Sequence, residues 1–229
     1  MFGAWILVIA VTLIIGMLAQ GHVKGTFSKF SRVPARNNYS GAEVAQQILQ
    51  SSGIHDVSIH EHNGFLGDHY DPIHKRLVLS SENFRGRSIS AIGVAAHECG
   101  HALQHQQAYA PLKIRMASVG VTNYATNMTN SLVMLSFFGF VSWGFILPIM
   151  AASYGVIMAF NLITLPVEYD ASRRAKAILK QMGFTSAPDE DRGVARVLNA
   201  AALTYVAAFV TSMLFFLLYL LPFLTGRDD

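Results

Sequence analysis

The chain has 229 residues, enough for one or two domains, and 52% of them are hydrophobic while only 14% are charged. Its mean hydropathy of +0.36 is too high for an ordinary soluble protein, so we predict a multi-span membrane protein. The formal net charge of +3 comes without a basic cluster interleaved with aromatic residues, which argues against a nucleic-acid partner. The single cysteine, Cys99, excludes an intrachain disulfide.

The chain begins with an uncharged apolar run at residues 2–19, close to the minimum length for a helix that spans a bilayer. A secretory signal peptide would carry basic residues before such a run, whereas here the basic residues follow it. These are Lys24, Lys29, Arg32 and Arg36. We therefore expect residues 1–20 to form an uncleaved transmembrane anchor, with its N-terminus outside the cell and the next segment in the cytoplasm.

Residues 21–115 are polar and mixed in charge, as the first part of a folded aqueous domain requires. Capping residues and apolar spacing predict its elements. The elements expected are a helix at 41–52 capped by Ser40, a strand at 56–60, a loop at 64–72, a strand at 75–80, and a helix that begins near Ser88 or Ser90.

The last of these helices contains the pattern H-E-x-x-H, with His97, Glu98 and His101. Histidines four residues apart lie about 40° from each other around a helix, so both imidazoles can reach one metal ion. Glu98 then lies beside the metal, where a carboxylate can take a proton from a water molecule. Cys99 is about 200° around the helix from His97, and we interpret it as a packing residue. The pattern predicts a zinc site.

A charge-free stretch follows, and we predict a transmembrane hairpin over residues 116–165, with helices at about 117–138 and 145–165. Its first helix carries five polar side chains, which we expect to face other helices or a water-filled cavity. Two interpretations remain open for them, interhelical hydrogen bonds and a polar approach to the active site. They are Thr122, Asn123, Thr126, Asn127 and Asn130.

Residues 166–199 are polar again and form the predicted second part of the catalytic domain, with an amphipathic helix that ends at Gly183. Residues 200–224 are predicted to form the last transmembrane helix. Sixteen of the 17 basic residues lie in the two polar stretches, which share one face of the membrane if the chain has four spans. The positive-inside rule makes that face cytoplasmic, and we expect a multi-pass protein of the plasma membrane.

A catalytic zinc ion generally takes three protein ligands, so a third is needed. The extended pattern H-E-x-x-H-x-x-G-x-x-H is excluded, because Gln104 and Gln107 occupy its last two fixed positions. His105 lies about 6 Å further along the helix axis than His101, too far to bind the same ion. We interpret His105 as a surface or hydrogen-bonding residue.

The remaining option is a glutamate from a later helix, and Glu168 is preferred. We expect Glu168 to open the helix that leaves the membrane, which would bring it to the motif helix. The alternative is a carboxylate favoured only by the helix dipole. Glu190 is less attractive because it lies in a P-D-E-D run, a predicted solvated loop. Asp170 is either an acceptor for the free N–H of a ligand histidine or an ordinary exposed carboxylate.

Three segments carry a resemblance to known proteins: GDHYDP at 67–72, AAHECGHALQH at 95–105 and LPVEYDASRRA at 165–175. They resemble the YugP-like neutral zinc metallopeptidases. The order of H-E-x-x-H, hairpin and later glutamate also resembles gluzincin membrane peptidases of the HtpX and CAAX-prenyl endopeptidase type. The likeness covers nearly the whole chain. It implies a mostly α membrane protein with four transmembrane helices and a small α+β zincin-like catalytic domain.

The resemblance also implies a membrane-bound zinc endopeptidase acting on proteins or peptides, with a role in membrane protein quality control. HtpX-type enzymes carry E-x-x-A-D around the glutamate, and this chain has Ser172 at the aspartate position. Whether Asp170 or Ser172 supports the metal site is therefore open. No feature of the sequence indicates an oligomeric state or a regulatory partner.

The expected chemistry is hydrolysis by water on a Zn²⁺ ion held by His97, His101 and Glu168, which would lower the pKa of that water toward ~7. Glu98 would take the proton and pass it to the leaving amine. Four side chains could stabilise the oxyanion. They are Tyr169, His69, Tyr70 and Arg173, although His69 and Asp71 are also explained as residues that shape a turn.

The sequence argues against three alternatives to this hydrolase. A zinc-binding scaffold without protease activity would have no need of the Glu98 carboxylate. An intramembrane site-2-type protease would carry H-E-x-x-H inside a spanning segment, whereas here polar and charged residues flank the motif. A transporter is more distant, because the predicted spans contain no charged residue.

Overall fold

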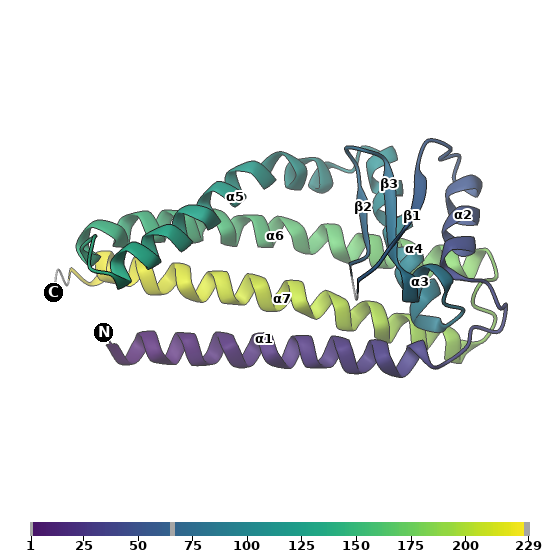
Figure 1. Ribbon diagram of the computed structural model, residues 1–229, viewed down its shortest axis with the longest axis horizontal. Coiled ribbons are helices and arrows are strands. Elements are labelled where there is room, and N and C mark those ends of the chain that lie inside the picture. The colour runs from purple at the N-terminus through teal and green to yellow at the C-terminus, as the bar shows by residue number, and fades with distance from the viewer. Residues whose placement is uncertain (1, 65–66, 227–229) are drawn as a thin grey trace. The chain divides into compact units, whose positions relative to one another are not determined.

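The computed structural model describes residues 2–64 and 67–226, and its fold is mostly helical with a small sheet, as predicted (Figure 1). The elements are α1 (Phe2–Ser31), α2 (Gly41–Ser51), β1 (Ser58–His62), β2 (His69–Asp71), β3 (Arg76–Ser80), α3 (Ser81–Arg85), α4 (Ile89–Gln106), α5 (Ala110–Phe137), α6 (Trp143–Gln181) and α7 (Pro188–Thr225). Within the described residues, three helices are long and apolar enough to cross a membrane, namely α1, α6 and α7.

The chain divides into two compact units. One, the apolar unit, contains the segments up to Ala19, from Ile114 to Leu165 and from Thr204 onward. The other, the polar unit, contains Gln20–Lys113 and Pro166–Leu203. Each unit is built from segments far apart in the sequence, so its packing depends on long-range contacts.

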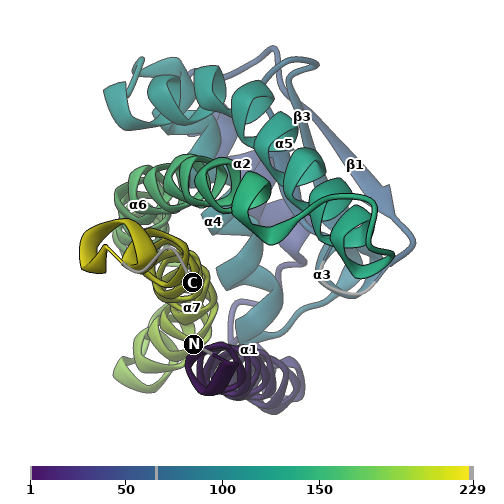
Figure 2. The same ribbon diagram turned by 90° about the vertical axis from the view of Figure 1, so that its left-hand side faces the viewer.

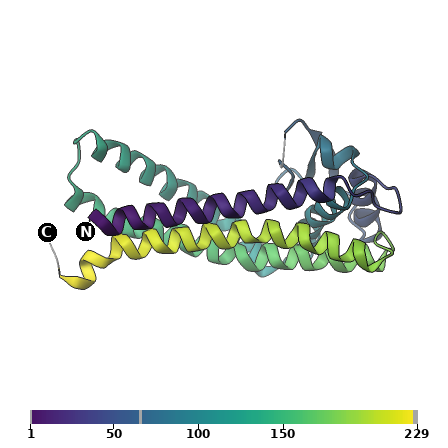
Figure 3. The same cartoon turned by 90° about the horizontal axis from the view of Figure 1, so that it is seen from below.

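In the apolar unit α1, α6 and α7 are held together by aromatic and polar contacts. The Trp5 ring meets the Tyr219 ring edge-on with centroids 4.8 Å apart, and Figure 3 shows α1 and α7 side by side. The Asn161 side chain of α6 donates to the Ser212 hydroxyl of α7 at 3.0 Å, and these two helices are neighbours in the end view of Figure 2. Ile146 and Met150 are fully buried beside Tyr219.

The helix α5 is long enough to span a bilayer, but its polar residues make it less apolar than the three candidate membrane helices α1, α6 and α7. Thr122 and Thr126 satisfy their hydroxyls locally, because each donates to the carbonyl four residues earlier. Asn123, Asn127 and Asn130 are exposed, so no helix in the described part of the chain covers them. The expectation that these side chains face other helices or a water-filled cavity therefore stays a prediction for the three asparagines. The four-span arrangement stays a prediction.

The polar unit has its core between α2 and α4. Ser40 caps α2 as predicted, because its hydroxyl accepts from the Glu43 N–H and its own N–H donates to the Glu43 carboxylate. The apolar face of α2 is buried against α4. Cys99 is fully buried there with its sulfur 3.7 Å from the Ala45 carbonyl oxygen, and burial raises the pKa of its thiol. It is a packing residue, as expected.

The sheet of the polar unit has the order β1-β3-β2, with β1 parallel and β2 antiparallel to β3. Two strands were predicted within two residues of their observed starts. Residues 65–66 of the loop predicted at 64–72 lie outside the described residues, and the prediction is wrong for 69–71, because β2 pairs His69 with Val78 and Asp71 with Arg76. A three-residue strand is too short to show an alternating pattern in the sequence. The strand β2 forms because it pairs with β3.

The helix α6 runs without a break for 39 residues, through Pro166. The sequence predicted two helices here, one for the charge-free stretch and one for the polar stretch that follows it. The continuity places Glu168 in the interior of a helix instead of at its N-terminus. The interpretation of Glu168 as a charge favoured by the helix dipole is therefore wrong.

Glu190 is not in a solvated loop but in the first turn of α7, and it is 3% exposed. One carboxylate oxygen accepts from the Arg36 N–H at 2.9 Å, and the other accepts from the Ser186 N–H at 2.9 Å and from the Ser186 hydroxyl. The sequence could not show this, because Arg36 is 154 residues away. Glu190 therefore fastens the segment that follows α1 to the start of α7 in the polar unit.

We expect Glu190→Ala to destabilise the protein by about 1–3 kcal/mol, because it leaves partly buried N–H groups without an acceptor. The neighbouring Asp189→Ala removes an exposed pair with Arg36 and should cost less than about 1 kcal/mol. Thermal unfolding of the detergent-solubilised protein, followed by loss of helical circular dichroism, measures both. Equal losses in the two variants would contradict the role given to Glu190.

Candidate metal centre

The candidate metal centre lies wholly in the polar unit, where α4 and α6 pack with their backbones in contact. Ser88 begins α4 by accepting a hydrogen bond from the Ala91 N–H at 3.2 Å. At Gly100 a Cβ atom would lie 2.7 Å from the Ala171 carbonyl oxygen and 3.1 Å from its carbonyl carbon. Only glycine permits this approach, so Gly100 fixes the distance between the helix with the histidines and the helix with Glu168.

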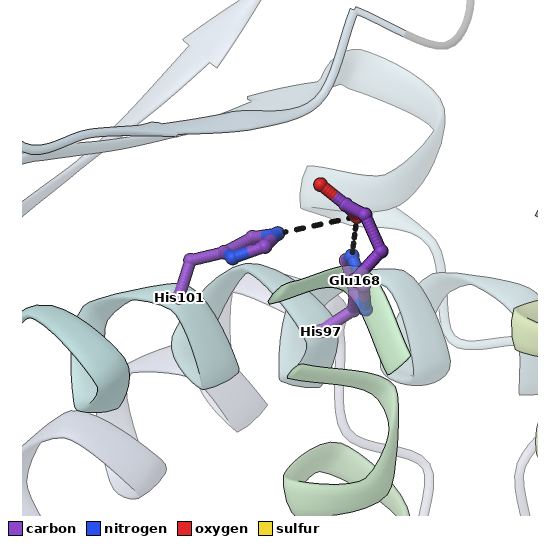
Figure 4. Close-up of side chains that lie close together, drawn as sticks. All are labelled: His97, His101 and Glu168. Atoms are coloured by element: carbon purple, nitrogen blue, oxygen red, sulfur yellow. Dashed lines mark hydrogen bonds and ion pairs between the residues drawn. The ribbon is translucent and has the colours of Figure 1, made fainter. Parts of the chain in front are cut away.

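Three side chains meet beside this contact, His97 and His101 from α4 and Glu168 from α6 (Figure 4). One oxygen of Glu168 lies 3.3 Å from His97 Nε2 and 3.5 Å from His101 Nε2. In a tetrahedral zinc site with bonds near 2.0–2.1 Å, neighbouring ligand atoms are about 3.4 Å apart. Both oxygen–nitrogen distances therefore suit a zinc ion, and the three candidate ligand atoms all lie within 4.8 Å of one another.

The tautomer of His101 is determined by Gln104, which is fully buried. The Gln104 amide nitrogen donates to the Val167 carbonyl at 2.8 Å and to the Asp170 carboxylate at 3.0 Å, so its oxygen must face His101. That oxygen accepts from His101 Nδ1 at 3.0 Å. The proton of His101 is thus on Nδ1, and the Nε2 lone pair is directed toward the other ligands.

His97 is oriented in the same way by a different residue. Its Nδ1 is 3.1 Å from the Ser172 hydroxyl oxygen, which accepts the Nδ1 proton when Nε2 offers its lone pair to a metal. Ser172 lies one helical turn after Glu168, so one face of α6 supplies both a candidate ligand and the partner of another. Ser172 therefore has a direct contact with a candidate ligand.

Asp170 supports the centre indirectly. It does not accept from a histidine, as the sequence suggested, but from Gln104. It also accepts from Arg174 Nε at 2.5 Å and from the Arg173 guanidinium. Burial by itself raises the pKa of the Asp170 carboxyl, but these donors outweigh it and hold the pKa below its usual range. Asp170 is thus an ionised anchor for Gln104 and not an ordinary exposed carboxylate.

The electrostatics of the two glutamates differ. Burial raises the pKa of Glu98, and the attraction of His97 and His101 offsets this only in part. Burial also opposes ionisation of Glu168, but the hydrogen bonds of His101 and His97 outweigh it and hold the pKa of Glu168 well below its usual range. Glu168 is consequently an anion suited to a metal, and Glu98 is a carboxylate with an increased affinity for a proton.

Most of the other residues singled out in the sequence have partners away from the three candidate ligands. The Tyr70 hydroxyl contacts His105 Nδ1 at 2.9 Å, and burial raises the pKa of Tyr70 to about 12. Arg173 pairs with Asp170, and Asp71 accepts from the N–H groups of the turn that follows β2. His69 is exposed, and its Nδ1 donates to the Gly67 carbonyl.

Sequence reasoning missed the supporting roles of Gln104 and Gly100. Gln104 was considered only as a position where a ligand was lacking, and Gly100 only as part of the motif spacing. The signal for Gly100 was its position between Cys99, which packs on α2, and His101. A helix that packs against neighbours on two faces favours a small residue between them. Gln104 gave no such signal, because its partners lie on α6.

The sequence also matches a known family over most of its length. Residues 5–224 match the family described as "Putative neutral zinc metallopeptidase". A similar protein is the "Putative membrane protease YugP" of Bacillus subtilis (strain 168), which is 43% identical over 215 residues, or 92% of this chain and 92% of that protein. No solved structure matches the chain significantly. The resemblance carried by the three sequence segments is confirmed, and zinc is the metal that the family description implies.

We expect Gly100→Ala to abolish zinc binding, because the added methyl group meets the backbone of Ala171 and forces α6 away from α4. Gly93→Ala is a matched control in the same helix, where the added Cβ would lie 3.5 Å from the nearest Val194 methyl, an ordinary contact. Zinc bound per purified protein, measured by atomic emission, compares them. Normal zinc content in Gly100→Ala would refute the helix contact as the constraint on the site.

Gln104→Leu should lower zinc affinity by roughly 10- to 100-fold, as is typical when the partner of a ligand histidine is lost. Gln106→Leu makes the same chemical change on an exposed face of α4 and should leave the affinity unchanged. Competition with a zinc chelator gives both dissociation constants. The role of Gln104 is refuted if the two variants retain zinc equally well.

Proposed function

Because this chain belongs to the family of neutral zinc metallopeptidases, we propose that it hydrolyses peptide bonds at the centre formed by α4 and α6. His97, His101 and Glu168 are the proposed zinc ligands, and Glu98 is the proposed general base. The observation that carries the proposal is the meeting of three donor atoms around one point beside a buried carboxylate. Two histidines from H-E-x-x-H and a glutamate from a later helix are the gluzincin ligand set.

The chemistry divides between the metal and the chain. A bound zinc ion would supply Lewis acidity, which lowers the pKa of a water molecule toward ~7 and polarises the scissile carbonyl. Glu98 accepts the proton of the attacking water on its carboxylate and passes it to the leaving amine nitrogen. The raised pKa of Glu98 suits this task, because a more basic carboxylate is a better proton acceptor. Gln104 and Ser172 hold the imidazoles of His101 and His97 in their orientations through hydrogen bonds to Nδ1.

A buried Glu98 also favours an enzyme over a zinc-binding scaffold. Glu98 is only 7% exposed and is not one of the proposed zinc ligands. Its burial lowers the stability of the folded protein, because burial opposes ionisation of the carboxyl group. Burial next to the histidines serves proton transfer and has no use in a passive binding protein. An intramembrane protease is disfavoured as well, since α4 belongs to the polar unit and is not one of the three apolar candidate spans.

We extend the proposal to the membrane topology. Four spans, formed by α1, α5, α6 and α7, leave the N-terminus outside and the polar unit in the cytoplasm. The basic residues support this, because ten lie at 21–115 and six at 166–199. A protease anchored in the plasma membrane with a cytoplasmic site suits unfolded segments of membrane proteins, so we place its activity in membrane protein quality control.

Glu98→Gln should lower kcat/KM for an unfolded protein substrate by at least about 100-fold while zinc content stays unchanged, because general-base catalysis is lost. Glu82→Gln, the same change at an exposed glutamate of α3, should keep full activity. Cleavage of a fluorescently labelled casein by the purified proteins measures this. Equal rates for Glu98→Gln and the wild type would exclude the proposed hydrolase.

The topology is tested in a Cys99→Ala background, where single cysteines report which side of the membrane they face. We expect Ser142→Cys, between α5 and α6, to react with a membrane-impermeant maleimide in intact cells, and Asn63→Cys to react only after permeabilisation. Both positions are exposed, so burial does not explain a difference. The reverse labelling pattern would contradict a cytoplasmic active site.

A further inference from the structure

The polar unit contains a cavity of about 640 Å³. It lies between the C-terminal part of α1, the region of α6 around Tyr169 and the first half of α7. None of the three candidate zinc ligands lines it. Its hydrogen-bonding and charged lining consists of His22, Thr26, Lys29, Tyr169, Arg196 and Asn199. The cavity is therefore separate from the metal centre and has a chemistry of its own.

The cavity is basic and lacks acidic neighbours. Its lining includes a lysine, an arginine and a histidine, and no carboxylate. Arg85 and Arg174 elsewhere in the polar unit each pair with a carboxylate. Within the described residues no carboxylate forms a salt bridge with Lys29 or Arg196, and the same is true of Lys24 and Arg192, which do not line the cavity. Two cations directed at one cavity without counter-charges attract an anion.

The cavity also lies at the level where helices leave the apolar part of the chain. His22 comes three residues after the apolar run at 2–19, and Tyr169 follows closely on the charge-free stretch at 116–166. Leu203 lies near the start of the last apolar run, and the apolar lining is completed by Phe30 and Ala200. In a membrane protein this level corresponds to the lipid headgroups, where basic pockets between helices and tyrosine side chains are enriched.

We propose that this cavity binds the phosphate of an anionic phospholipid headgroup. Lys29 and Arg196 neutralise the phosphate, and Thr26, Asn199 and Tyr169 offer hydrogen-bond donors. Leu203, near the start of the last apolar run, contacts the first carbons of an acyl chain. The position of Leu203 beside the last apolar run favours a lipid over inorganic phosphate or an acidic peptide. The inference rests on the proposed membrane topology and not on protease activity.

The test compares two double variants with the same loss of charge on the same two helices. Lys29→Gln/Arg196→Gln removes the cations of the cavity, and Lys24→Gln/Arg192→Gln removes exposed cations that do not line it. Each full-length protein is placed in nanodiscs of phosphatidylcholine with increasing fractions of phosphatidylglycerol. Native mass spectrometry of the released protein then counts the phosphatidylglycerol molecules that stay bound.

We expect Lys29→Gln/Arg196→Gln to weaken phosphatidylglycerol binding by roughly 10- to 30-fold, because it removes the electrostatic attraction of two basic residues for the anionic lipid. The control variant should bind as the wild type does. Equal binding by all three proteins, or equal loss in both variants, would overturn the assignment. Helical circular dichroism and zinc content of each variant show whether the fold is intact.

Two further arms distinguish the source of the anion. Inorganic phosphate and an oligoglutamate peptide are added to the wild type in nanodiscs that contain phosphatidylglycerol. Neither should displace the bound lipid. Displacement by phosphate would assign the cavity to a soluble phosphate compound, and displacement by the peptide would assign it to an acidic protein segment. Because lipid retention is measured without catalysis, a failure of the peptidase proposal leaves this result unaffected.

Discussion

The approach of α4 to α6 at Gly100 and Ala171 is the constraint that brings the residues of the candidate metal centre together. On α4 the two histidines lie on one face because they are four residues apart, and on α6 Glu168 and Ser172 share a face for the same reason. The backbone contact brings these faces together without an intervening side chain that could adjust. Zinc ligands tolerate displacements of only a few tenths of an ångström, so a rigid contact between two helices suits them better than a loop would.

Around that contact the buried polar groups form a connected set. Arg174 pairs with Asp170, Asp170 accepts from Gln104, and Gln104 accepts from His101. In an environment of low dielectric each of these groups would be costly without its partner, and each partner permits only one orientation. The network therefore determines which nitrogen of the imidazole carries the proton. Ser172 repeats this arrangement for His97 with a single hydroxyl.

The sequence predicted the parts of this site that depend on local periodicity. Helical angles alone place His97 and His101 together and turn Cys99 away from them, and the structure shows that Cys99 packs on α2. Glu168 was reached by eliminating the alternatives, and Ser172 by a resemblance that left its role open. The continuity of α6, the strand β2 and the buried position of Glu190 could not be read locally, because each depends on partners distant in the chain. Gln104 belongs with these, since its partners Val167 and Asp170 come more than sixty residues later.

The central claim is that one metal ion joins α4 to α6 through two imidazoles and one carboxylate. X-ray absorption at the zinc edge of the purified protein, compared with Glu168→Ala, tests it most directly. The account predicts two nitrogen ligands and oxygen ligands near 2.0–2.1 Å in the wild type, and little bound zinc in the variant. A sulfur ligand near 2.3 Å, a third imidazole, or an unchanged spectrum and zinc content in Glu168→Ala would contradict it.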